Sequence, residues 1–115
     1  MATVVNYKVG STRAARSGPV RWLTLQLGAP EGSIRGVSLF FWERDPGAFG
    51  FVNQDTGFVV ANLPVADFQG MYAILQTEKP VFVHWRTDPE ESRLASIDIS
   101  TSEEPVGEGT NDSSP

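Results

Sequence analysis

The sequence predicts a mainly β protein, an antiparallel β-sandwich or a small open barrel of six to seven strands with one short helix. Two observations predict this class. Apolar and polar residues alternate with a period of two in several short segments, which is the pattern of half-buried strands. Clusters of Gly, Pro, Asn, Asp and Ser separate these segments at short intervals, as turns between antiparallel strands do.

Two strands are expected near the N-terminus, over Thr3–Val9 and Val20–Leu27, joined by a flexible basic loop at 10–19. The first strand places Val5 and its alternate neighbours on an apolar face. In the second, three alternate leucines form one face and Trp22 lies on the other. Because the leucines already supply a core face, Trp22 is expected to be exposed or covered by a second layer.

The third expected strand, Ile34–Glu43, becomes apolar on both faces toward its end. Leu39 and Phe41 lie on one face, and Phe40 and Trp42 lie on the other. A strand of this kind is central in a layered fold, or it lies at an interface with a partner.

A tight β-hairpin is predicted where Phe49–Asn53 and Phe58–Ala61 flank the short polar connection 54–57, which ends in glycine. Aromatic pairs stabilise antiparallel sheets. We therefore expect the three phenylalanines of this hairpin to pair across it and to supply part of the core: Phe49, Phe51 and Phe58.

The segment Leu63–Lys79 fits a helix or a strand. As a helix, its apolar residues recur at i, i+3, i+4 and i+7: Phe68, Met71, Tyr72 and Leu75. Asn62 or Asp67 would cap its start and Pro80 would stop it. As a strand, the same segment alternates up to a hairpin turn before Pro80. The many strong helix formers favour the helix, whereas Gly70 counts against it.

Two further strands, Val81–Thr87 and Leu94–Ser100, are expected to pair as antiparallel neighbours through a polar connection. From residue 101 onward the chain is polar and acidic with a single valine, too little apolar surface to order itself. The sequence thus predicts one domain over residues 1–100 and a disordered acidic tail over 101–115.

Composition excludes several classes of function. The chain has no cysteine, which rules out disulfides, thiolate metal sites and cysteine nucleophiles, and its one histidine rules out a multi-histidine site. The acidic loop at 88–91 is interpreted as a solvated turn rather than a calcium site. No cofactor or metal is expected. No apolar run approaches the roughly 20 residues of a membrane-spanning helix, and no secretory signal is recognisable, so we expect a cytoplasmic protein without membrane contact.

Charge is unevenly distributed along the chain. Residues 1–44 carry six Lys and Arg against two acidic residues, and residues 45–115 carry three against twelve. The first part could offer a basic surface to an anionic partner. The net charge of -5 nevertheless opposes binding to a polyanion, so nucleic acid is not an expected partner.

The candidate site residues are Trp22, Trp42, His84, Trp85 and Arg86. His84 lies mid-strand where Asp98 of the neighbouring strand could face it, as an acid orients a catalytic base. No serine sits in a glycine-flanked elbow to serve as its nucleophile.

Three functional hypotheses follow. The preferred one is a non-enzymatic binding or assembly module that contacts a protein, including a copy of itself, through a sheet face or edge. The alternative is a glycan or small-molecule module with Trp22, Trp85 and Arg86 lining the site. A small His84-dependent enzyme is the third. A cleft shared by tryptophans with Arg86 or His84 would favour a small ligand, and a flat patch would favour a protein.

Overall fold

The computed structural model describes residues 2–12, 18–88 and 93–101, and confirms the mainly β class with one short helix. The predicted acidic loop and tail, and the middle of the basic loop, lie largely outside the described residues. Within the described residues the elements are, in order, β1 (Ala2–Ser11), β2 (Pro19–Glu31), β3 (Ile34–Trp42), β4 (Gly50–Asn53), β5 (Phe58–Pro64), a 3-10 turn (Val65–Asp67), α1 (Phe68–Thr77), β6 (Val81–Thr87) and β7 (Leu94–Ser100).

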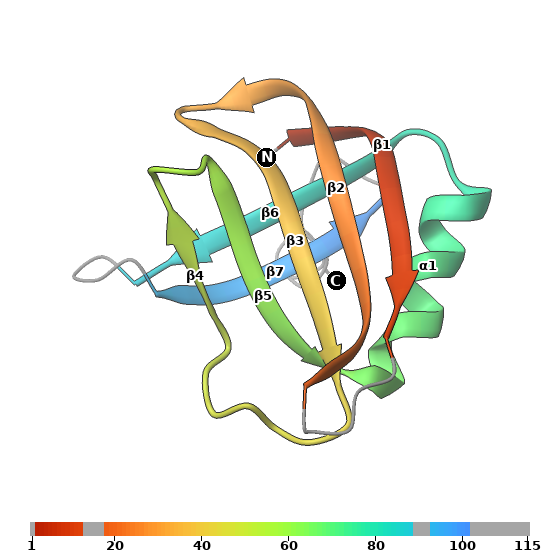
Figure 1. Ribbon diagram of the computed structural model, residues 1–115. Coiled ribbons are helices and arrows are strands. Elements are labelled where there is room, and N and C mark those ends of the chain that lie inside the picture. The colour runs from red at the N-terminus through yellow and green to blue at the C-terminus, as the bar shows by residue number, and fades with distance from the viewer. Residues whose placement is uncertain (1, 13–17, 89–92, 102–115) are drawn as a thin grey trace, which may run out of the picture.

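The strands form one mixed sheet in the order β4-β5-β3-β2-β1-β6-β7. The pairs are antiparallel except β3 with β5, which is parallel and was not expected from the sequence. The sheet curls so that β6 and β7 pass behind β5, β3 and β2 (Figure 1). An isolated bridge connects Phe51 of the edge strand β4 to Arg93, the residue just before the other edge strand, β7. The result is a flattened, nearly closed barrel with two layers.

The core lies between these two layers. The predicted leucine face of β2 is confirmed, since Leu23 and Leu25 are fully buried. Leu23 pairs with Leu39 of β3, which pairs in turn with Ala61 of β5, so one buried row crosses three strands. Val83 of β6 is buried in the same hydrophobic core. Burial of these aliphatic side chains is the main force that holds the layers together.

The helical alternative for 63–79 is confirmed, although α1 begins only at Phe68 because Leu63 and Pro64 complete β5. Its buried residues are Phe68 and Leu75. The ring of Phe68 meets Phe41 edge-on at 5.2 Å between centroids and stacks on Tyr72 at 5.4 Å. The helix lies beside β1 (Figure 1). Its aromatic face closes the barrel where β1, after Val4, no longer pairs with β6.

Four residues that were predicted to face or supply the core lie outside it: Val5, Phe49, Phe51 and Phe58. Val5 is 59% exposed because a β-bulge between Val4 and Asn6 shifts the alternation of β1. The predicted hairpin of β4 and β5 is confirmed, but its phenylalanines do not pair with one another, since Phe51 pairs with Val60 and Phe58 with Asn53. Phe49 and Phe51 are 40% and 43% exposed, and Phe58 lies outside the hydrophobic core. They cannot enter the core because Val52, paired with Val59, occupies the inward position of the hairpin.

No helix built from the described residues has both the length and the apolar character required to span a membrane.

Candidate interaction face

The five strands β1–β5 present one face to the core and one away from it, here called the outer face. The row Gly10–Trp22–Phe40–Asn62 lies next to the buried row through Leu23 and Leu39, and therefore points the opposite way. Within the described residues, no helix or strand covers the outer face (Figure 1). The outer face is thus an uncovered sheet surface that extends over five strands.

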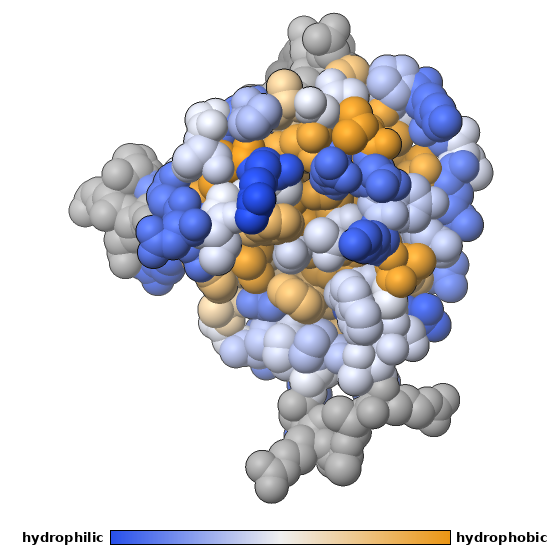
Figure 2. All heavy atoms as spheres, turned by 45° about the horizontal axis from the view of Figure 1, so that its top comes forward, coloured by the Kyte–Doolittle hydropathy of each residue, from blue (hydrophilic) through white to orange (hydrophobic). Residues whose placement is uncertain are grey.

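Aromatic side chains gather on the outer face of β2–β5. They come from positions that alternate with core residues, and none of them is fully buried: Trp22, Phe40, Trp42, Phe51 and Phe58. Phe51 is the most open of them, and Val60 lies directly opposite it. Figure 2, which views the molecule obliquely from above this face, shows hydrophobic side chains in the centre with polar ones among and around them. The apolar outer side of β3 predicted from the sequence therefore belongs to a wider patch.

Two of these rings lie on glycines of neighbouring strands. A Cβ atom at Gly10 would overlap the indole of Trp22, and one at Gly36 would overlap the ring of Phe58. A side chain at either position would force the ring to move, because the ring lies directly over the glycine backbone. Part of the burial of Trp22 and Phe58 is consequently intramolecular, and one side of each ring is held by the sheet.

Trp42 is held by a side chain of β5. Its Nε1 donates a hydrogen bond of 2.9 Å to Asn62 Oδ1, and Asn62 Nδ2 donates one of 3.1 Å to the carbonyl oxygen of Ala48. Asn62 therefore fixes both the indole and the loop 43–49. A hollow of about 380 Å³ lies between this loop, Trp42 and the end of β5.

A second hollow of about 380 Å³ lies across β1 and β2 beside Phe58. Its polar and charged lining residues are Asn6, Lys8, Thr24, Gln26 and Arg35. The guanidinium carbon of Arg35 stands 5.6 Å from the centroid of the Phe58 ring, a cation–π arrangement, and Arg35 Nε donates a 3.2 Å hydrogen bond to Thr56 O. The residues that line this hollow include two cations and no acid.

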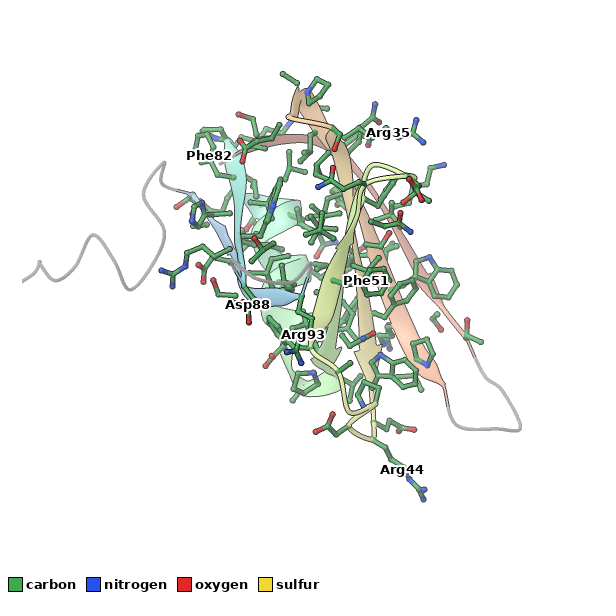
Figure 3. The ribbon with its side chains drawn as sticks, turned by 90° about the vertical axis from the view of Figure 1, so that its left-hand side faces the viewer. Arg35, Arg44, Phe51, Phe82, Asp88 and Arg93 are labelled. Carbon is green, nitrogen blue, oxygen red and sulfur yellow. The ribbon has the colours of Figure 1, made fainter. Side chains whose placement is uncertain are left out.

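The predicted site residues fall on three surfaces. Trp22 and Trp42 lie together on the outer face, on either side of Phe40. His84 and Arg86 point outward from the other layer, because they alternate with the buried Val83. Trp85 points inward and packs against the core. Figure 3 shows the layers edge-on, with Phe82 of β6 on the opposite side of the molecule from Arg35 and Phe51.

The structure therefore does not bring Trp22, Trp85 and Arg86 into one site. Trp22 pairs with Gly10 near the end of β1, whereas β6 pairs with β1 only along Ala2–Val4. Neither of the two hollows described above is lined by Arg86 or His84.

His84 faces Asp98 across β6 and β7, as the sequence predicted. Its Nδ1 atom is enclosed and has no hydrogen-bond partner within the described residues. Arg86 Nε donates a 3.3 Å hydrogen bond to Ser96 Oγ of the neighbouring strand β7. Among the residues that the structure describes, no three His, Asp or Glu side chains gather to hold a metal ion.

Sequence reasoning missed Lys8, Arg35, Phe51 and Phe58 as members of the outer face. The available signals were the two-sided apolar pattern of 39–42, which identified Phe40 and Trp42, and the position of Trp22 opposite the leucine face of its strand. Which neighbours join them depends on the pairing of β3 with β5, a contact that local patterns do not encode.

Searches for similar proteins found no matching family model, no matching curated protein and no matching solved structure.

Proposed function

We propose that this protein is a non-enzymatic interaction module whose outer face binds another protein, including a second copy of itself. The observation that carries the proposal is the aromatic patch of β2–β5, which lies outside the core and beneath no described element. Large exposed apolar patches are rare on monomers and typically mark interaction sites. Trp, Phe and Arg are also the residue types enriched at the centres of protein interfaces.

The way these rings are held supports the same proposal. Trp22 rests on Gly10, Phe58 rests on Gly36, and Trp42 is hydrogen-bonded to Asn62. Side chains that are already ordered lose little conformational entropy when a partner arrives, so more of the contact energy appears as affinity. The aromatic residues also come from four strands and extend beyond either hollow, whereas small-molecule sites enclose most of their ligand in one concave pocket. These features favour a protein partner.

A charge on the most exposed ring of the patch tests the proposal. Phe51→Glu would place a carboxylate on the outer face, and Val9→Glu is its matched control. Both parent side chains are 43% exposed, but Val9 pairs with buried Leu23 and so belongs to the opposite side of the sheet. Circular dichroism and urea unfolding would first verify that both variants are folded.

Sedimentation equilibrium would then measure self-association against the monomer mass of 12.5 kDa. The wild type and Val9→Glu should show a mass that rises with concentration, and Phe51→Glu should remain monomeric. If the partner is a different protein, co-purification from source cells should lose that protein only with Phe51→Glu. Equal masses and equal bound proteins for all three chains would refute the proposal.

A further inference from the structure

The strands that build the outer face are almost free of acidic residues. Among the residues of β1–β5, Glu31 at the end of β2 is the only acid, although the chain as a whole has a net charge of -5. The same strands place two cations beside the outer face, Lys8 and Arg35, whereas Arg21 lies over the ring of Phe68 on the core side of the sheet. Near the hollow beside Phe58 the local potential is therefore more positive than the net charge of the protein suggests, whereas the hollow beside Trp42 is lined by Glu43 and Asp45 together with Arg44.

Lys8 and Arg35 both line the hollow beside Phe58. Lys8 pairs with Thr24 across β1 and β2 and is exposed, and within the described part of the chain it has no ion-pair partner. Arg35 Nε donates a hydrogen bond to Thr56 O, and the guanidinium lies over the ring of Phe58. A cation without a counter-charge beside an aromatic surface is suited to an anionic group that arrives with apolar neighbours.

We propose that the partner presents an acidic, extended peptide segment to the outer face. Its carboxylates lie in the hollow at Lys8 and Arg35, and its apolar side chains pack on Trp22 and Phe40. This inference rests on the proposed function and specifies the chemistry of the partner.

The distance between Lys8 and Trp22 on the outer face fits such an extended segment. Lys8 stands at the register position of Thr24, two residues along β2 from Trp22, which corresponds to about 7 Å in a strand. Residues i and i+2 of an extended peptide project to the same side at that spacing. A carboxylate and an apolar side chain separated by one residue would therefore reach Lys8 and Trp22 together.

A peptide fits this face better than a polyanion does. Only two cations line the hollow, and the chain is acidic overall, so a nucleic-acid backbone would meet little local neutralisation and a repulsive net charge. A short acidic segment needs only one or two counter-charges. Its apolar side chains gain the remaining affinity from the aromatic patch.

Selection of a random peptide library on the full chain tests this inference. The wild type, Lys8→Gln and Phe51→Glu would be used as bait in parallel. Peptides enriched on the wild type should combine Asp or Glu with apolar residues at i and i+2. For a synthetic copy of the best peptide, Lys8→Gln should weaken binding about fivefold, and salt should weaken it further. Lys79→Gln, which removes an exposed lysine outside the outer face, should bind as the wild type does.

Each other outcome has a definite meaning. Neutral or basic enriched peptides, or unchanged binding by Lys8→Gln, would overturn the acidic partner and leave the proposed function standing. Enrichment on the wild type no greater than on Phe51→Glu would overturn the proposed function as well. Oligothymidylate, titrated separately, should bind weakly; binding tighter than that of the best peptide and lost in Lys8→Gln would identify a nucleic-acid site instead.

Discussion

Replacing Asn62 by alanine should destabilise the protein and release Trp42. Asn62 is the only side chain among the described residues that hydrogen-bonds both the outer face and the β3–β4 loop, through Trp42 Nε1 and Ala48 O. The substitution removes both bonds but no core contact, because the Asn62 side chain points outward. Asn62→Ala therefore isolates the contribution of this one amide.

The magnitude follows from the two bonds. An intramolecular hydrogen bond contributes about 0.5–1.5 kcal/mol net, and both of these are at or near the surface, where water partly replaces the lost partner. We expect the free energy of unfolding to fall by about 1–2 kcal/mol. In a domain of this size the midpoint temperature falls by about 4–8 °C for each kcal/mol.

Urea unfolding followed by tryptophan fluorescence would measure the change, with Trp42→Phe and the double variant completing a cycle. The coupling between Asn62→Ala and Trp42→Phe should be about 1 kcal/mol, because each variant removes the same hydrogen bond. Asn53→Ala is the matched control. Asn53 Oδ1 accepts hydrogen bonds from the amides of Asp55 and Thr56, so its loss should be similar in size without coupling to Trp42.

Additive effects of Asn62→Ala and Trp42→Phe would refute this reasoning, since they would mean that the hydrogen bond contributes nothing to stability. A loss below about 0.3 kcal/mol for Asn62→Ala alone would have the same meaning.

The remaining predictions concern the glycines and the core, and denaturant unfolding checks each. Gly70→Ala should stabilise the protein by about 0.5–1 kcal/mol, because Gly70 lies inside α1 with open space around it. Gly57→Ala should destabilise it by about 1–2 kcal/mol, because Gly57 has a φ of 77° and a Cβ would stand 2.9 Å from Ser33 O. If both glycine substitutions changed the free energy of unfolding in the same direction, the assigned conformations would be contradicted. Leu39→Ala should cost about 2–5 kcal/mol, since Leu39 is fully buried between Leu23 and Ala61, and a loss below 1 kcal/mol would show that β3 is not central.

The sequence predicted the elements better than their arrangement. Strand β2, the hairpin of β4 and β5, and the pairing of His84 with Asp98 follow from local alternation and turn residues. α1 follows from its helical stripe, although Asn62, one of the two expected caps, instead bonds Trp42. These features depend on neighbours in the chain, which is why periodicity and turn chemistry could predict them.

The arrangement depends on contacts between distant segments. The parallel pairing of β3 with β5 and the pairing of β1 with β6 decide which strands share the outer face, and no local pattern encodes either. The bulge at Val5 reverses a face that the alternation appeared to define. For β4, Phe51 and Val52 are both apolar, so the sequence alone could not decide which of them enters the core.

Asn62 explains which face of β2, β3 and β5 turns toward the core and which turns outward. Once the strands are paired, Trp22 and Phe40 share a row with Asn62, while Leu23 and Leu39 share the adjacent row with Ala61. Turning the first row inward would bury an amide and expose three aliphatic side chains, because a one-residue slip exchanges the two faces of a strand. An unpaired buried amide costs about 1–3 kcal/mol, and the two large rings exceed the space that leucine and alanine fill. Asn62 therefore favours the register that leaves the aromatic row outside, where it is available to a partner.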